Sequence, residues 1–303
     1  MNMITMSAPG KLMLFGEHAV VFGEPCIVTA VDQRLSVTAE KNSRISINAP
    51  QVKETKFVDR AVHAFFSKYS KNSRVRLTIS SQFSHQVGFG SSSAVTVATL
   101  RALSLFFNVP MSDREIFDVA YHVTLDIQGV GSGFDIAAAT YGGSLYFKKG
   151  GSTIDPLSLS GIPLVVGYTG VKADTPNLVR EVAEKQKKYP EKVNKIFIAI
   201  GKLVEEARTR MQAGEWERVG KLMDFNQEYL RDLGVSSEKL EALIGAAKKA
   251  GAWGAKLSGA GGGDCMIALA PSDKREAIEK GIAKAGGEVI AVSPNAGGVR
   301  VEP

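Results

Sequence analysis

A glycine–serine segment that runs directly into an apolar helix is the feature that most constrains this chain. Residues 88–94 have the sequence Gly-Phe-Gly-Ser-Ser-Ser-Ala, and the apolar positions after it predict a helix over residues 92–107. Glycine lets a backbone approach a ligand closely, and the free N–H groups at a helix N-terminus favour phosphate. No Gly-Lys-Ser/Thr follows, so this is not a Walker A loop. The segment, called the serine loop below, predicts phosphate binding, and a serine cap after a glycine turn is the alternative interpretation.

The elements on either side of the serine loop indicate an α+β protein with two lobes. A chain of 303 residues exceeds what one hydrophobic core usually serves. The polar stretch 148–152 predicts a flexible boundary, so we expect an N-terminal lobe, residues 1–150, and a C-terminal lobe, residues 151–303. The expected strands are 28–40, 74–80, 142–147, 163–167, 265–270 and 288–292, and the expected helices are 56–69, 92–107, 112–127 and 272–285. A further helical region, from about residue 175 to 250, is broken near residues 189–190, 213–214 and 233–234.

The composition argues against several classes of protein. Two cysteines, Cys26 and Cys265, and four histidines without metal-ligand spacing argue against a disulfide framework and a zinc enzyme. No apolar run approaches the roughly 18 residues of a membrane span. No basic stretch precedes an apolar block at the start, so we expect a cytoplasmic protein without a membrane partner. The formal charge of +6 favours an anionic small molecule and is too weak and scattered for nucleic acid.

Four charged or polar side chains interrupt otherwise apolar surroundings. Lys11 follows Ala-Pro-Gly, and Glu17 and His18 come just beyond a glycine in the same apolar run. Asp135 lies beside a Gly-Ser turn, ahead of a helix of small residues. Taken alone, Lys11 can be a surface lysine, Glu17 and His18 a polar hairpin tip, and Asp135 a helix cap. The residues by themselves leave these interpretations open.

A second glycine-rich segment lies near the end of the chain. Residues 258–264, called the glycine loop below, have the sequence Ser-Gly-Ala-Gly-Gly-Gly-Asp and lie between two strand-like segments. Five small residues are more than a tight turn needs, so the loop predicts a backbone wall against a substrate or a phosphate. The alternative is a flexible hairpin. Thr169 lies in another polar loop, at the end of an expected strand.

Taken together and in this order, the segments resemble the GHMP kinases, a family named for galactokinase, homoserine kinase, mevalonate kinase and phosphomevalonate kinase. The three motifs of that family appear as Ala-Pro-Gly-Lys (8–11), the serine loop (88–94) and Lys-Leu-Ser-Gly-Ala-Gly-Gly-Gly (256–263). The resemblance runs from about Ser7 to Cys265. It implies the two-lobed GHMP-kinase fold, with a mixed α/β first lobe, a helix-rich second lobe and the active site between them.

Within this family, two segments point to particular members. Residues 15–23 are most similar to mevalonate kinases, and residues 131–135 are also similar to phosphomevalonate kinases. The resemblance implies that ATP, with Mg²⁺, phosphorylates the primary hydroxyl of mevalonate, a step of isoprenoid precursor synthesis. The alternatives are a phosphomevalonate kinase and, with less support, a non-catalytic ligand sensor on the same fold. A homodimer is left open.

The resemblance also assigns roles to individual residues. Asp135 would be the general base, and Lys11 would lie beside it and stabilise the transferring phosphoryl group. The phosphates of ATP would be bound by Gly88, Gly90, Ser91, Ser92 and Ser93, with Ser92 as the Mg²⁺ ligand. The acceptor would be bound by Glu17, His18, Thr169, Gly259, Ala260 and Gly261.

The chain departs from the family pattern at a metal ligand. Mevalonate kinases usually carry a glutamate ligand of Mg²⁺ eleven residues before the aspartate, where this chain has Thr124. Asp126 is no simple substitute, because two residues along a helix turn a side chain by about 200°. We therefore expect the metal to rely on Ser92, phosphates and water. Two smaller departures lie at residues 84–87 and at Phe89.

Overall fold

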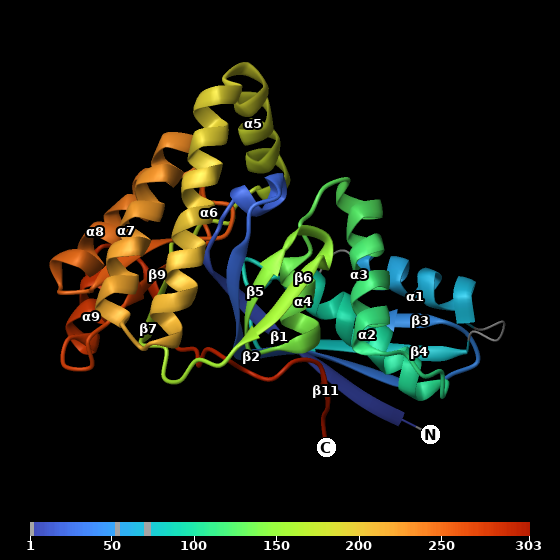
Figure 1. Ribbon diagram of the computed structural model, residues 1–303. Helices are drawn as coiled ribbons and strands as arrows, with labels where there is room; N and C mark the ends of the chain where they lie inside the picture. The colour runs from blue at the N-terminus through green and yellow to red at the C-terminus, as the bar shows by residue number, and fades with distance from the viewer. Residues whose placement is uncertain (1–2, 52–54, 70–73) are drawn as a thin grey trace.

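The computed structural model describes residues 3–51, 55–69 and 74–303, and its strands form two separate sheets (Figure 1). Residues 1–2, on which part of the expectation about the N-terminus rests, lie outside the described residues. Within those ranges, no helix combines the length and the apolar character that a membrane span requires.

The larger sheet is built around two long antiparallel strands, β1 (Met3–Phe15) and β2 (Cys26–Lys41). Its order is β11-β1-β2-β4-β3, and β5 pairs with β2 and with β6. The other members are β3 (Ser46–Asn48), β4 (Val75–Ser81), β5 (Ser144–Lys148), β6 (Thr153–Leu157) and β11 (Arg300–Val301). β1 is buried along nearly its whole length, because it has protein on both faces.

Four helices cover this sheet in two layers. α2 (Ser91–Phe106) and α4 (Phe134–Tyr141) pack on β1 and β2, and α1 (Lys56–Tyr69) and α3 (Asp113–Gln128) pack on the outside of α2. α3 begins with a capping box, in which the Ser112 hydroxyl accepts from the Glu115 N–H and the Glu115 carboxylate accepts from the Ser112 N–H. α2 begins at Ser91, one residue before the predicted start.

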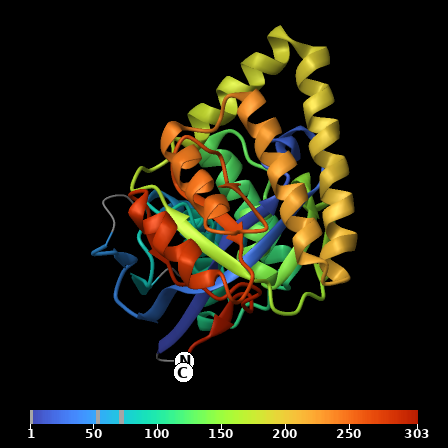
Figure 2. The ribbon, with the colours of Figure 1, turned by 90° about the vertical axis from the view of Figure 1, so that its left-hand side faces the viewer.

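The smaller sheet is antiparallel, with the order β10-β7-β9-β8. Its strands are β7 (Leu164–Tyr168), β8 (Gly254–Ser258), β9 (Cys265–Leu269) and β10 (Glu288–Ile290). Its helices are α5 (Thr175–Lys188), α6 (Pro190–Gln212), α7 (Trp216–Leu233), α8 (Glu238–Lys249) and α9 (Arg275–Lys284). The helices α7, α8 and α9 pack on this sheet. The helix α6 packs on α7 and contacts β1 and β2, and α5 packs on α6, as the yellow helices of Figure 2 show. The three predicted breaks in the helical region coincide with the boundaries of α5, α6, α7 and α8.

The predicted boundary at residues 148–152 lies between two strands of the larger sheet. A short 3₁₀ turn, Lys149–Gly151, joins β5 to β6 there, so the segment connects two paired strands. The division between residues 150 and 151 stays a proposal. Because β6 pairs with β5, the boundary between the lobes would instead lie after β6. The chain end also returns to the first sheet, where Arg34 donates to the carbonyls of Gly297 and Gly298 at 2.9 and 2.7 Å. Near the end of the chain, β11 pairs with β1, and Val301 lies opposite Met6 (Figure 1).

Candidate active site

Lys11 and Asp135 form an ion pair where the first lobe meets the second. The Lys11 Nζ lies 3.0 Å from Asp135 Oδ1. Lys11 follows a register shift in β1 and is buried, so it is not a surface lysine. Asp135 lies in the first turn of α4, whose N-cap is Gly133, so it is not the helix cap. The Asp135 side chain keeps 31 % of its surface exposed, which leaves the carboxylate open to a ligand.

The backbone of the serine loop lies against this pair. The Gly88 carbonyl accepts from Lys11 Nζ and the Phe89 carbonyl from the Lys11 N–H, both at 3.0 Å. Gly90 has a φ of 75°, and a Cβ there would lie 3.0 Å from Lys11 Cε and 3.4 Å from Asp135 Oδ1. A larger residue at position 90 would therefore be strained and would crowd the pair.

Two helices begin at this ion pair. Gly90 precedes α2 and Gly133 precedes α4, and glycine offers no side-chain acceptor to the first N–H groups of a helix. Ser91 and Ser92 are partly exposed, whereas Ser93 is buried. Free N–H groups and the positive ends of two helix dipoles suit an anionic ligand such as a phosphate chain.

Glu17 and His18 lie in a second, buried cluster. The Glu17 carboxylate forms an ion pair with Lys256 on β8, and both side chains are fully buried. Burial raises the pKa of Glu17 and lowers that of Lys256, and each partner opposes the shift of the other. His18 Nε2 lies 2.8 Å from the Ala260 carbonyl, and burial lowers the pKa of this imidazole. Through these contacts, Glu17 and His18 connect the segment after β1 to β8 and to the glycine loop.

The glycine loop is also held by Ser258, whose hydroxyl accepts from the Met13 N–H and donates to the Met13 carbonyl, both at 3.0 Å. Gly261 has a φ of 84°, and a Cβ there would lie only 2.0 Å from the Val235 carbonyl oxygen. At Gly259, a Cβ would meet nothing within 4 Å. The loop connects the antiparallel strands β8 and β9, and it is packed against protein at Gly261 and open at Gly259.

Thr169 is fully buried in the turn after β7. Its hydroxyl donates to the Val171 carbonyl and accepts from the Val171 N–H, both at 3.2 Å. Its own N–H donates to the carbonyl of Asp264 at 2.9 Å. Thr169 therefore shapes its own loop, and its predicted contact with the acceptor stays a prediction. Asp264, the last residue of the glycine loop, is bonded to this turn and is not among the predicted site residues.

Thr124 stands at the position where mevalonate kinases usually carry a glutamate ligand of Mg²⁺. Thr124 is buried, and its hydroxyl donates to the Ala120 carbonyl at 3.1 Å within α3. Asp126 is paired with Arg60 on the surface. Over the described ranges, no group of three or more His, Cys, Asp or Glu side chains could hold a metal. Mg²⁺ keeps several waters and needs few protein ligands, and the partly exposed hydroxyl of Ser92 at the start of α2 is the kind of hard oxygen that suits such an ion.

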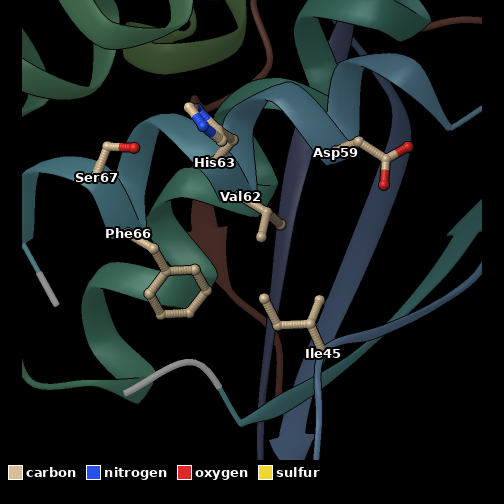
Figure 3. Close-up of a pocket in the computed structure, with 6 residues that line it drawn as sticks. All are labelled: Ile45, Asp59, Val62, His63, Phe66 and Ser67. Atoms are coloured by element: carbon tan, nitrogen blue, oxygen red, sulfur yellow. The ribbon is translucent and has the colours of Figure 1, made fainter. Parts of the chain in front are cut away.

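A hollow on the surface of α1 is separate from these residues (Figure 3). It is lined by Ile45, Asp59, Val62, His63, Phe66 and Ser67, and Figure 3 shows these side chains on α1 and on the segment before β3. None of them is a predicted site residue.

Comparison with known proteins identifies the family. The model described as GHMP kinases N terminal domain matches residues 56–143, and the model described as GHMP kinases C terminal matches residues 203–288. A mevalonate kinase of Thermococcus sibiricus is 37 % identical over 330 aligned positions, which cover 99 % of this chain and 98 % of that protein. This chain belongs to the GHMP kinases. The predicted family and the predicted α+β fold are confirmed, and this GHMP kinase is a small-molecule kinase that uses ATP.

Solved structures of two different kinases match this chain equally well in fold and differ in sequence identity. The mevalonate kinase of L. major in complex with R-mevalonate has a TM-score of 0.83 and 28 % identity, and the match covers 96 % of this GHMP kinase and 95 % of that chain. The phosphomevalonate kinase of Streptococcus pneumoniae reaches the same TM-score of 0.83 at 17 % identity, and covers 97 % of this chain and all of its own. At that identity, the likeness shows the fold alone.

Proposed function

We propose that this GHMP kinase transfers the terminal phosphoryl group of ATP to the primary hydroxyl of mevalonate. The observation that carries the proposal is the Lys11–Asp135 pair, with 3.0 Å between Nζ and Oδ1, directly beneath the backbone of the serine loop. Full-length relatives that are named mevalonate kinases support the choice of acceptor. The proposal does not need the hollow on α1.

Asp135 is the general base of this proposal. Its carboxylate is partly exposed, whereas the ammonium beside it is buried, so an acceptor hydroxyl can reach the carboxylate oxygen and deliver its proton there. Lys11 holds the carboxylate in place and lies next to the oxygen that attacks. Phosphoryl transfer passes through a loose transition state, so positioning and charge stabilisation supply most of the catalysis.

The phosphates of ATP bind at the start of α2 in this proposal. The N–H groups of Ser91, Ser92 and Ser93 and the dipole of the helix stabilise the negative charge, and the glycines at positions 88 and 90 allow the close approach. Mg²⁺, when bound, neutralises charge on the phosphates, and the Ser92 hydroxyl is the residue that we propose holds it.

The acceptor lies between the Lys11–Asp135 pair and the open side of the glycine loop. His18 is fixed by the Ala260 carbonyl, and Gly259 has free space beside it. In this proposal Glu17, Thr169 and Gly261 shape the site of the acceptor. The polar groups of Glu17 and Thr169 and the α-carbon of Gly261 are packed against other parts of the protein. A cytoplasmic location, a homodimer and the absence of a nucleic-acid partner stay predictions.

The test is an acceptor comparison. The purified protein is incubated with ATP, Mg²⁺ and either R-mevalonate or phosphomevalonate, and ADP release is followed in both reactions. We expect turnover with mevalonate and none with phosphomevalonate. Turnover with phosphomevalonate alone would contradict the proposal, and binding of mevalonate without turnover would point to a ligand sensor.

A further inference from the structure

We propose that Asp264 is a positioning residue that fixes the serine loop over the Lys11–Asp135 pair. This inference rests on the proposed function, because it concerns the same site. It starts from the backbone of Asp264, which has a φ of 54°. Residues other than glycine seldom adopt this conformation, and a strained residue at a site points to a role for its side chain.

The side chain of Asp264 lies directly against Gly88. A Cβ on Gly88 would lie 2.6 Å from both Cγ and Oδ2 of Asp264, so the two residues are in contact and only glycine fits. The neighbouring thiol of Cys265 donates to the Val87 carbonyl at 3.1 Å. The end of the glycine loop is therefore the support on which residues 87–88 rest.

Gly88 passes this support on to the proposed catalytic pair. Its carbonyl accepts from Lys11 Nζ at 3.0 Å, and two residues later Gly90 packs against Lys11 and Asp135. A shift of Gly88 would move the acceptor of Lys11 and the start of α2 together. Asp264 therefore acts on these groups through Gly88. Burial raises the pKa of Asp264 and the Lys11 ammonium opposes that rise, so the two side chains also interact electrostatically.

Asp264 is itself held rigidly by the loop after β7. Its Oδ1 accepts from the Ala173 N–H at 2.9 Å, its carbonyl accepts from the Thr169 N–H at 2.9 Å, and its N–H donates to the Val171 carbonyl at 2.7 Å. These bonds fix both the backbone and the carboxylate. The fixed elements of the second lobe thus set the position of the serine loop, which belongs to the first lobe.

The first test replaces Asp264 by glycine and by asparagine. Glycine tolerates the backbone conformation but leaves Gly88 unsupported, so we expect kcat/KM for ATP to fall about 10- to 100-fold. Asparagine keeps the volume and the Oδ1 acceptor, so its activity should stay within about threefold of the wild type. The matched control is Asn108→Gly, because Asn108 has a φ of 53°, is exposed and follows α2 far along the chain from the serine loop.

Binding of the ATP analogue AMPPNP with Mg²⁺, measured by calorimetry without an acceptor, separates this inference from the proposed acceptor. Asp264→Gly should weaken this binding about tenfold at a temperature where thermal denaturation shows the variant to be folded, and Asn108→Gly should leave the binding unchanged. A wild type that does not phosphorylate mevalonate would contradict the proposed function and leave this result intact. Asp264→Gly with wild-type turnover and AMPPNP affinity would overturn the positioning role.

The second test is a double-mutant cycle. Gly88→Ala drives a methyl group into the Asp264 carboxylate, whereas Gly88→Ala combined with Asp264→Gly removes that clash and keeps only the strain of a φ of 76°. We expect the change in Tm caused by Asp264→Gly to be more favourable in the Gly88→Ala background than in the wild type. Strictly additive changes in Tm would show that the two residues do not interact and would overturn the inference.

Discussion

Two lysine–carboxylate pairs in this molecule have the same chemistry and opposite surroundings. In the Lys11–Asp135 pair, 9 % and 31 % of the side-chain surfaces are exposed, whereas in the Lys256–Glu17 pair both values are 0 %. The exposed carboxylate can meet a hydroxyl group and take its proton. No ligand can reach the buried carboxylate without a rearrangement. The Lys256–Glu17 pair instead joins the two lobes, because Glu17 follows β1 and Lys256 lies on β8. Burial, and not residue type, separates the proposed catalytic pair from the structural one.

The largest effect should come from removing the ammonium of the open pair. Lys11→Met should lower kcat about 10²- to 10⁴-fold, because it removes charge stabilisation at the transferring group and the partner of the Gly88 carbonyl. Steady-state ADP release measures this loss, and Lys280→Met, in an exposed pair with Glu276, is the control that should leave kcat unchanged. A Lys11→Met enzyme with a normal kcat would place the chemistry elsewhere.

Breaking the buried pair should affect stability more than catalysis. Lys256→Met leaves the Glu17 carboxylate buried and unpaired, so we expect the free energy of unfolding to fall by about 3–5 kcal/mol. Urea unfolding followed by circular dichroism measures this change.

A double variant, Glu17→Leu with Lys256→Met, sharpens the comparison. Replacing both buried charges by apolar groups is often nearly neutral, so most of the lost stability should return. If the folded double variant keeps the KM for mevalonate, Glu17 has a structural role only. A large rise in that KM would instead support the predicted contact of Glu17 with the acceptor.

A smaller effect is expected at the proposed metal ligand. Ser92→Ala should weaken the use of Mg·ATP about tenfold, seen as a higher Mg²⁺ concentration for half-maximal rate, because one hard oxygen ligand is lost. Ser93→Ala is the comparison variant, because it keeps the N–H that the proposal assigns to the phosphates and removes only a buried hydroxyl. An unchanged Mg²⁺ dependence in Ser92→Ala would assign the ligand to another group.

The smallest effect is expected at His18. His18→Ala should raise the KM for mevalonate more than the KM for ATP, because this residue lies against the glycine loop and not the serine loop. The expected rise is a few-fold, since the imidazole already has a protein partner. An equal rise in both KM values would indicate a loss of packing instead of a loss of acceptor binding.

The sequence predicted the elements of the fold that depend on local pattern. α1 has the predicted bounds, and the breaks at Pro190 and at the glycines of the helical region end helices as expected. The local pattern does not predict β3, β6 and β11, because they are short, irregular in pattern and defined by their partners in the sheet. The stretch 148–152 predicts a flexible boundary for the same reason, because its glycines suit a flexible segment and a tight turn equally well.

The residues of the candidate site could be predicted from the sequence only where they belong to a motif of the family. Nothing local to Lys11 or Asp135 indicates that they meet, and the resemblance to the GHMP kinases supplied that contact. Lys256 could have been noticed as a lysine inside an apolar strand, and Asp264 as an acid that ends a run of glycines. Their partners lie far away in the sequence, so periodicity and composition could not identify them.

The measurement that tests the central claim most directly is the turnover of Asp135→Asn with ATP and R-mevalonate, together with its affinity for AMPPNP. The substitution keeps the size of the side chain and removes its ability to accept the proton of the hydroxyl group. We predict a kcat at least about a hundredfold lower, with the affinity for AMPPNP unchanged. An Asp135→Asn enzyme that phosphorylates mevalonate at the wild-type rate would contradict the account.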